Sequence, residues 1–268
     1  MTDFESQPLC ELEICAGDIA SAIAAAAAGA DRVELCSALP LGGLTPPLST
    51  ISLTAPPALK IRRHVLLRPR PGDFLYTEDE MKAMIADIRS PLLSDVDGIV
   101  IGVLKADGSV DTENTRRLME EARQASGRNL SFTFHRAFDM TADPLAALDD
   151  VVSLGFDRIL TSGCAPSAEQ GIPMLRILNK RAAGNITIMA GGGINADNAR
   201  RIMQLSGCRS LHASCSHIRT SNMTFRNPRA FMGDPDADEY TFSTTSVEKV
   251  RSLLAAMHNC SIDLQQKH

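Results

Sequence analysis

The chain has 268 residues, a length at which one domain is favoured over two, and its 44% hydrophobic and 22% charged residues are ordinary for a globular protein with a large core. A net charge of −5 without any basic stripe excludes a nucleic-acid-binding surface. Seven cysteines, an odd number at irregular spacing, do not form the disulfide framework of a small secreted protein, so we expect free thiols in a reducing compartment.

The chain begins with MTDFESQPLC, which has neither the basic nor the apolar region of a secretory signal. The longest apolar stretch, residues 19–30, is too short and too rich in alanine to span a bilayer. We therefore expect a cytoplasmic protein that has no contact with membranes or nucleic acids.

Short apolar or β-branched runs then alternate with longer helical patterns, which is typical of βα units around a parallel sheet. The expected helices have readable ends, such as Asp18 before the first and the pair Thr77 and Glu80 before the third. The second unit is the weakest, because prolines flank residues 48–55 and leave room for two turns at most. The expected strands are residues 10–15, 32–36, 64–68, 98–103, 131–135, 158–162, 186–190 and 210–214.

Eight such units in about 250 residues, with a glycine-rich turn after the seventh, favour a closed (β/α)8 barrel that occupies residues 1–268 as one domain. An open, doubly wound sheet is the alternative. After the eighth strand, residues 217–245 form a long connection before the last helix. A loop of that length is a lid over the barrel mouth or a contact between subunits, and both interpretations stay open.

Strand alternation predicts which side chains face the barrel axis, because the outer face of each strand lies under helices and is apolar. The inward side chains would be Glu11, Glu13 and Cys15 of the first strand, Glu34 and Cys36 of the second, His64, Arg68 and Arg70 of the third, Ser131, Thr133 and His135 of the fifth, and Ser210, His212 and Ser214 of the eighth.

This lumen is unusually polar, since barrel interiors are normally layered with Val, Ile and Leu. Buried charges need partners, so we expect Glu34 to pair with Arg68 on the neighbouring strand. Low in the lumen, Glu11 and His64 are interpreted as structural. Functional residues are expected at the carboxyl ends of the strands, where barrel enzymes hold their sites; they are Glu13, Cys15, Glu34, Cys36, Arg70 and His135.

A Glu-apolar-Cys triplet occurs twice, as Glu13-Ile14-Cys15 and Glu34-Leu35-Cys36, on adjacent strands. Each triplet aims a carboxylate and a thiol into the lumen. Two neighbouring thiols suit Cu(I) better than four-coordinate zinc, so Cys15 and Cys36 are candidate metal ligands. Cysteine is also a common small core residue, and two packed, inert thiols are the alternative.

A second group of residues indicates anion binding. Gly191-Gly192-Gly193 follows the seventh strand and opens a helix, which is the usual phosphate position of β/α barrels. Ser214 and Arg68 would complete this site; a tight turn without a ligand is the alternative. With Glu13 or Glu34 as base, His135 as acid and Arg70 as anion clamp, the rim could run lyase- or isomerase-like proton transfer on a small phosphorylated or carboxylated compound.

At these residues the sequence resembles the CutC family, named for copper homeostasis. The resemblance covers residues 9–226 and rests on EICAGDIASAIAAAAAGADRVELCS, LGGLTP, LLRPRPGDF, FHRAFD, RILTSG, GGGI and SNMTFRN. It implies a cytoplasmic β/α barrel that forms homo-oligomers, dimers or tetramers, and binds Cu(I) through Cys15 and Cys36. No organic cofactor is indicated. Two hypotheses result: a Cu(I)-binding homeostasis protein, and a barrel enzyme that acts on a small anionic metabolite.

Overall fold

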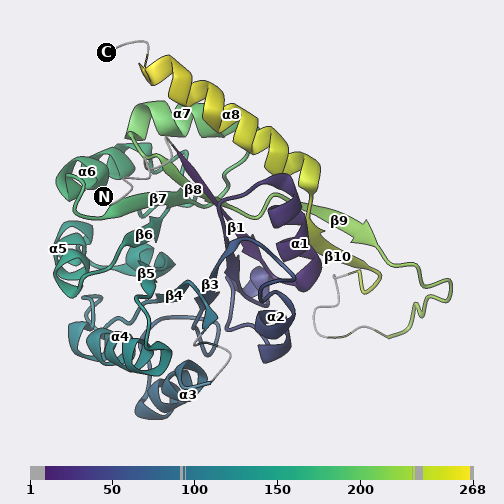
Figure 1. Cartoon of the computed structure of the whole chain (residues 1–268), viewed down its shortest axis with the longest axis horizontal. Coiled ribbons are helices and arrows are strands. Elements are labelled where there is room, and N and C mark those ends of the chain that lie inside the picture. Colours follow the sequence, from purple (N-terminus) through teal and green to yellow (C-terminus); the bar gives the residue numbers. More distant parts are fainter. Residues whose placement is uncertain (1–9, 91–92, 94, 231, 233–237, 266–268) are drawn as a thin grey trace.

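The computed structural model describes residues 10–90, 93, 95–230, 232 and 238–265. Eight parallel strands close into a barrel in sequence order, with the last strand paired to the first through Glu11 opposite Ser210 (Figure 1). Closure rules out the open sheet and confirms the (β/α)8 prediction. The strands are β1 (Glu11–Ala16), β2 (Arg32–Leu35), β3 (Arg62–Leu66), β4 (Gly98–Ile101), β5 (Ser131–Phe134), β6 (Arg158–Thr161), β7 (Thr187–Gly191) and β8 (Ser210–Ala213).

Helices surround this barrel and mostly begin at the caps that the sequence indicates (Figure 1). Asp18 accepts a hydrogen bond from the Ser21 amide at the start of the first helix, and Thr77 with Glu80 forms the expected capping box. The proline-flanked second helix has six residues. The helices are α1 (Ile19–Ala28), α2 (Leu48–Leu53), α3 (Glu78–Ile88), α4 (Thr112–Ser126), α5 (Pro144–Leu154), α6 (Ile172–Ala182), α7 (Ala196–Ser206) and α8 (Val247–Gln265), with 3-10 turns η1 (Leu39–Leu41) and η3 (Arg136–Met140).

The strands separate two hydrophobic regions by parity, as alternation predicts. Leu12, Ile14, Val33 and Leu35 belong to the large core between the strands and the helices. Inside the barrel, a small separate cluster holds Cys15, Cys36, Leu66 and Val100, with Leu39 packed against it. Both triplet thiols therefore face the lumen.

The connection expected as a loop over residues 217–245 contains two further strands. β9 (Ser216–Thr220) and β10 (Thr241–Thr245) pair antiparallel and extend away from the barrel (Figure 1). The base of this pair is held to α1, because the Ser21 hydroxyl lies 3.1 Å from that of Thr244. Within the described part of the chain, no helix is both long and apolar enough to cross a membrane.

Candidate functional site

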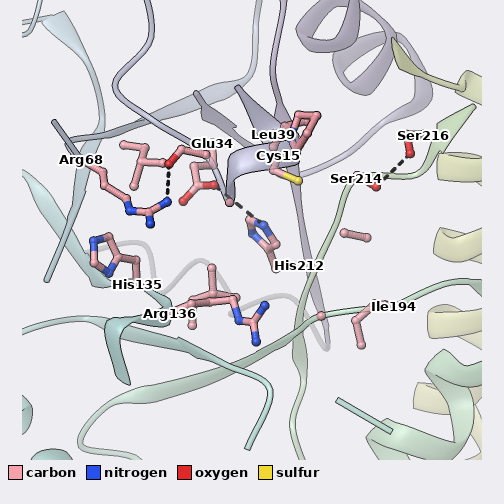
Figure 2. Close-up of a pocket in the computed structure, with 18 of the residues that line it drawn as sticks. Cys15, Glu34, Leu39, Arg68, His135, Arg136, Ile194, His212, Ser214 and Ser216 are labelled. Atoms are coloured by element: carbon pink, nitrogen blue, oxygen red, sulfur yellow. Dashed lines mark hydrogen bonds and ion pairs between the residues drawn. The ribbon is translucent and has the colours of Figure 1, made fainter. Parts of the chain in front are cut away.

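A cavity of about 480 Å³ opens at the carboxyl ends of the barrel strands (Figure 2). Its wall collects side chains that are far apart in sequence, since each parallel strand delivers its last inward residues to the same end of the barrel. The lining includes Cys15, Glu34, Leu39, Leu66, Arg68, Phe74, His135, Arg136, Leu160, Gly192, Gly193, Ile194, His212 and Ser214.

Below the cavity, a chain of ion pairs neutralises the charges of the lumen. Arg32 is fully buried and donates to Glu13 Oε2 at 2.5 Å and to Glu11 Oε1 at 2.7 Å. Glu11 also contacts Arg62 at 3.0 Å. These pairs explain how a polar lumen is tolerated. Strand alternation alone predicts that Arg32 faces the lumen, because it lies two residues before Glu34 and four before Cys36 on the same expected strand.

Glu13, a predicted base, lies beneath the cavity and does not line it. Its second oxygen is 2.7 Å from His212 Nδ1, so both oxygens have partners. Burial alone would raise the pKa of Glu13, but Arg32 and His212 hold that pKa well below its usual range. A carboxylate held this way positions His212 and is a poor proton acceptor.

Glu34, the other predicted base, does line the cavity, and its partner differs from the prediction. Its carboxyl Oε2 lies 3.8 Å from His212 Nε2, and no ion pair links it to Arg68. Burial raises the pKa of Glu34 to about 7 and nearby Glu13 adds to this, while His212 and Arg32 oppose the shift. Glu34 thus has a pKa suited to proton transfer near neutral pH.

His212 stands between these two glutamates and next to Cys15 (Figure 2). Burial opposes its protonation, but Cys15, Glu13 and Glu34 together raise the pKa of His212 well above its usual value. When protonated, His212 places a positive charge in the cavity wall. The sequence pattern predicted only that the His212 side chain faces the barrel axis.

Arg68 reaches the cavity wall, but backbone carbonyls occupy most of its donors. It donates to the carbonyl oxygens of Leu41 at 3.0 Å, Gly43 at 2.9 Å and Gly72 at 2.7 Å, and its guanidinium lies 4.9 Å from the Phe74 ring centroid. The prediction that Arg68 pairs with Glu34 is wrong, because the segments after β2 and β3 bring these carbonyls closer. Arg68 joins the loops of the rim.

Arg70, the predicted anion clamp, is outside the cavity. It pairs with Glu80 at 2.5 Å and with Asp73 at 2.9 Å on the outer side of the rim. Alternation placed it inward, but β3 ends at Leu66 and the following turn no longer alternates. Its predicted orientation is therefore wrong.

His135 lines the cavity as a neutral donor. The ring is buried, and Nδ1 accepts a hydrogen bond from the Ala137 amide at 3.1 Å, so the proton belongs on Nε2. Burial, together with the charge of Arg68, lowers the pKa of His135 to about 3. His135 as acid stays a prediction, and a neutral ring would donate its proton from Nε2. Nε2 has no hydrogen-bond partner among the described residues.

The two candidate thiols occupy neighbouring positions across β1 and β2. The amide of Cys36 donates to the Ala16 carbonyl at 3.0 Å, directly after Cys15. Cys15 lines the cavity, whereas Cys36 is fully buried behind it with its Sγ 3.5 Å from the same carbonyl. Burial raises the pKa of Cys36 well above its usual value, and nearby Glu34 adds to this. The described residues contain no group of three or more His, Cys, Asp or Glu side chains arranged for a metal ion.

The glycine-rich turn leaves β7 and enters α7, whose cap is Asn195. Gly191 ends the strand, while Gly192 at φ +101° and Gly193 at φ +77° adopt conformations that side chains disfavour. Gly192 and Gly193 line the cavity together with Ser214.

Arg136, which was not among the residues predicted from the sequence, also lines the cavity (Figure 2) and lies beside Gly192. Its guanidinium carbon lies 3.8 Å from the position that a Cβ on Gly192 would occupy. Asp139 holds its Nε at 2.8 Å and the Ser162 hydroxyl lies 3.1 Å from Nη2. The predicted anion position therefore does have a cation beside it. That cation is Arg136 of η3, and not Arg68, which follows β3. The sequence signal for Arg136 was its position directly after the inward-facing His135, in the segment FHRAFD at the end of the fifth strand.

Comparisons with known proteins agree with this architecture. The copper homeostasis protein cutC homolog of Homo sapiens is 44% identical over 249 residues, covering 92% of this chain and 89% of that protein. Family protein CutC of Bacteroides thetaiotaomicron is 41% identical over 248 residues, covering 92% and 98%.

Among solved structures, CutC of Streptococcus agalactiae superposes with a TM-score of 0.70 at 31% identity, covering 76% of this chain and 98% of that one. Phosphoribosylanthranilate isomerase of Pyrococcus furiosus, with a TM-score of 0.53 at 10% identity over 93% of this chain and 99% of that one, shares the fold alone. The sequence model named CutC family matches residues 10–217, and the chain belongs to the CutC family.

Proposed function

We propose that this protein acts in copper homeostasis by binding Cu(I) through Cys15 and Cys36 at the barrel mouth. Two relatives that cover 92% and 91% of the chain carry the name copper homeostasis protein cutC homolog. The observation that carries the proposal is the separate cluster inside the barrel, in which both thiols pack with Leu66 and Val100, away from the main core. The proposal places the protein in the cytoplasm as a homo-oligomer.

The donor set fits Cu(I) in number and in kind. Thiolates are soft ligands that favour Cu(I), and two of them fall short of the four ligands of a structural zinc site. Leu39 and Leu66 provide an apolar surround that limits access of water. Since burial raises the pKa of Cys36, Cu(I) would displace a proton from that thiol on binding.

An anaerobic Cu(I) titration against a competing chelator tests this proposal. We expect Cys15→Ser and Cys36→Ser each to lower the Cu(I) affinity at least about tenfold, because each removes one of two strong ligands. Cys208→Ser is the matched control, since Cys208 is equally buried but belongs to the outer core. Wild-type affinity in the double variant Cys15→Ser/Cys36→Ser would contradict the proposal.

A further inference from the structure

The cavity has polar features on the wall opposite the thiols that Cu(I) binding does not use. Arg136 lies beside Gly192 in the cavity wall, together with Gly193. His135 stands near Arg68 on another side (Figure 2). The volume of about 480 Å³ is far larger than a single ion requires and lies within the range of small-molecule sites.

His135 supplies the strongest indication of a ligand. It is 4% exposed, and its Nε2–H has no acceptor among the described residues although the ring lines the cavity. The ring is held in place: its Nδ1 accepts from the Ala137 amide, and its centroid lies 4.9 Å from that of Phe74. A Cβ on Gly102 would lie only 2.7 Å from the ring, so the glycine makes room for it. A fixed, buried donor of this kind matches a ligand oxygen.

Arg136 with the glycine turn supplies a complementary position for negative charge. Asp139 and Ser162 fix the guanidinium beside Gly192. The two glycines let the backbone of the turn approach a bound group closely, and loops after the seventh and eighth strands hold phosphate in many barrels. Arginine is also the side chain best suited to phosphate oxygens.

We propose that the cavity binds a small phosphorylated compound whose phosphate lies between Arg136 and the Gly192–Gly193 turn and whose carbonyl or carboxylate oxygen accepts a hydrogen bond from His135 Nε2. The lining of the cavity also has an apolar part, which includes Leu160, Phe74 and Ile194. A compact carbon chain fits such a surface. This binding is independent of the copper proposal, because it uses neither thiol.

Isothermal titration calorimetry with 2-phosphoglycolate and with inorganic phosphate tests the phosphate position on the full chain. We expect wild type to bind both, and Arg136→Ala to weaken both at least about tenfold, as expected for a lost charge-assisted contact. Arg117→Ala is the matched control, because Arg117 is an ion-paired arginine of similar exposure, 42% against 46%, on the outer helix α4. No binding by wild type, or equal affinities in the two variants, overturns the proposal.

The same titrations test the oxygen position. His135→Phe keeps a ring but removes the N–H, so we expect it to weaken 2-phosphoglycolate about tenfold and to leave inorganic phosphate unchanged. Equal losses for both ligands, or none, overturn the role of His135. If His135→Phe does not fold, the comparison of Arg136→Ala with Arg117→Ala still tests whether the cavity binds phosphate. Cys15→Ser/Cys36→Ser should bind 2-phosphoglycolate like wild type, which separates this inference from copper binding.

Discussion

His135 and Glu34 line the same cavity, and for both side chains burial favours the uncharged form. The pKa of His135 falls to about 3, and the pKa of Glu34 rises to about 7. His212 is buried as well, yet Cys15, Glu13 and Glu34 around it raise its pKa. The charge of each lumen residue is therefore set by its burial and its nearest partners more than by its residue type.

The lowered pKa of His135 predicts acid sensitivity. The unfolded chain takes up a proton below the ordinary value of 6.5, while the folded protein stays neutral at this ring down to about 3, so stability falls as the pH falls through this window. At about 1.4 kcal/mol per pH unit, wild type should lose about 3 kcal/mol more than His135→Phe between pH 6.5 and pH 4.

Urea unfolding at several pH values measures this difference. His258→Phe is the control, because it replaces a histidine that is exposed on α8. Parallel profiles of wild type and His135→Phe would contradict the expected linkage.

At the scale of elements, the cap of α7 holds the glycine turn in place. Asn195 accepts from the amides of Asp197 and Asn198, and the Asn198 side chain accepts in return from the Asn195 amide. Asn198 also donates to the Gly193 carbonyl at 2.8 Å. The turn that enters the cavity is thereby tied to the first turn of the helix.

Removing this cap should destabilise the protein modestly. We expect Asn195→Ala to lower the free energy of unfolding by about 1 kcal/mol, because two amides of α7 lose their acceptor. Thr77→Ala removes the capping box of α3 and should cost a similar amount. Chemical denaturation at neutral pH measures both, and a wild-type stability of Asn195→Ala would show that water replaces the cap at no cost.

At the scale of the whole molecule, the barrel is closed around buried ion pairs. Arg32 on β2 joins Glu11 and Glu13 of β1 and lies 3.6 Å from the Met189 sulfur on β7. The stability of the lumen depends on complete pairing, since either partner alone would be a buried, uncompensated charge.

Arg32→Met should therefore lower the free energy of unfolding by about 3–5 kcal/mol, because it leaves buried Glu13 without its main cation. Arg62→Met is the matched control: Arg62 pairs with the same Glu11 but is 48% exposed, and its loss should cost less than about 1 kcal/mol. Equal losses in urea unfolding would contradict this account of the lumen.

Local sequence patterns were sufficient to predict the strands and helices of the barrel. Alternation placed Leu12 and Ile14 outward and Cys15 inward, and capping residues such as Asp18 and Thr77 marked helix starts. Both signals operate over a few residues, so they are readable from the chain alone. Alternation failed for Arg70 because it holds only while the strand continues, and β3 ends at Leu66.

Partners and charge states depended on segments that meet only in the folded barrel. Arg68 bonds to carbonyls of the loop after β2 instead of to Glu34, and Arg136 reaches Gly192 from η3. Barrel closure brings β8 beside β1 and so gives Glu13 its contact with His212. The amino-acid sequence thus determined the eight strands, which side chains of each strand face the lumen, and the inward position of the two thiols. It could do so because strand alternation and helix capping depend only on neighbouring residues. The folded arrangement determined pairing and protonation, because these depend on distances between remote segments and on burial.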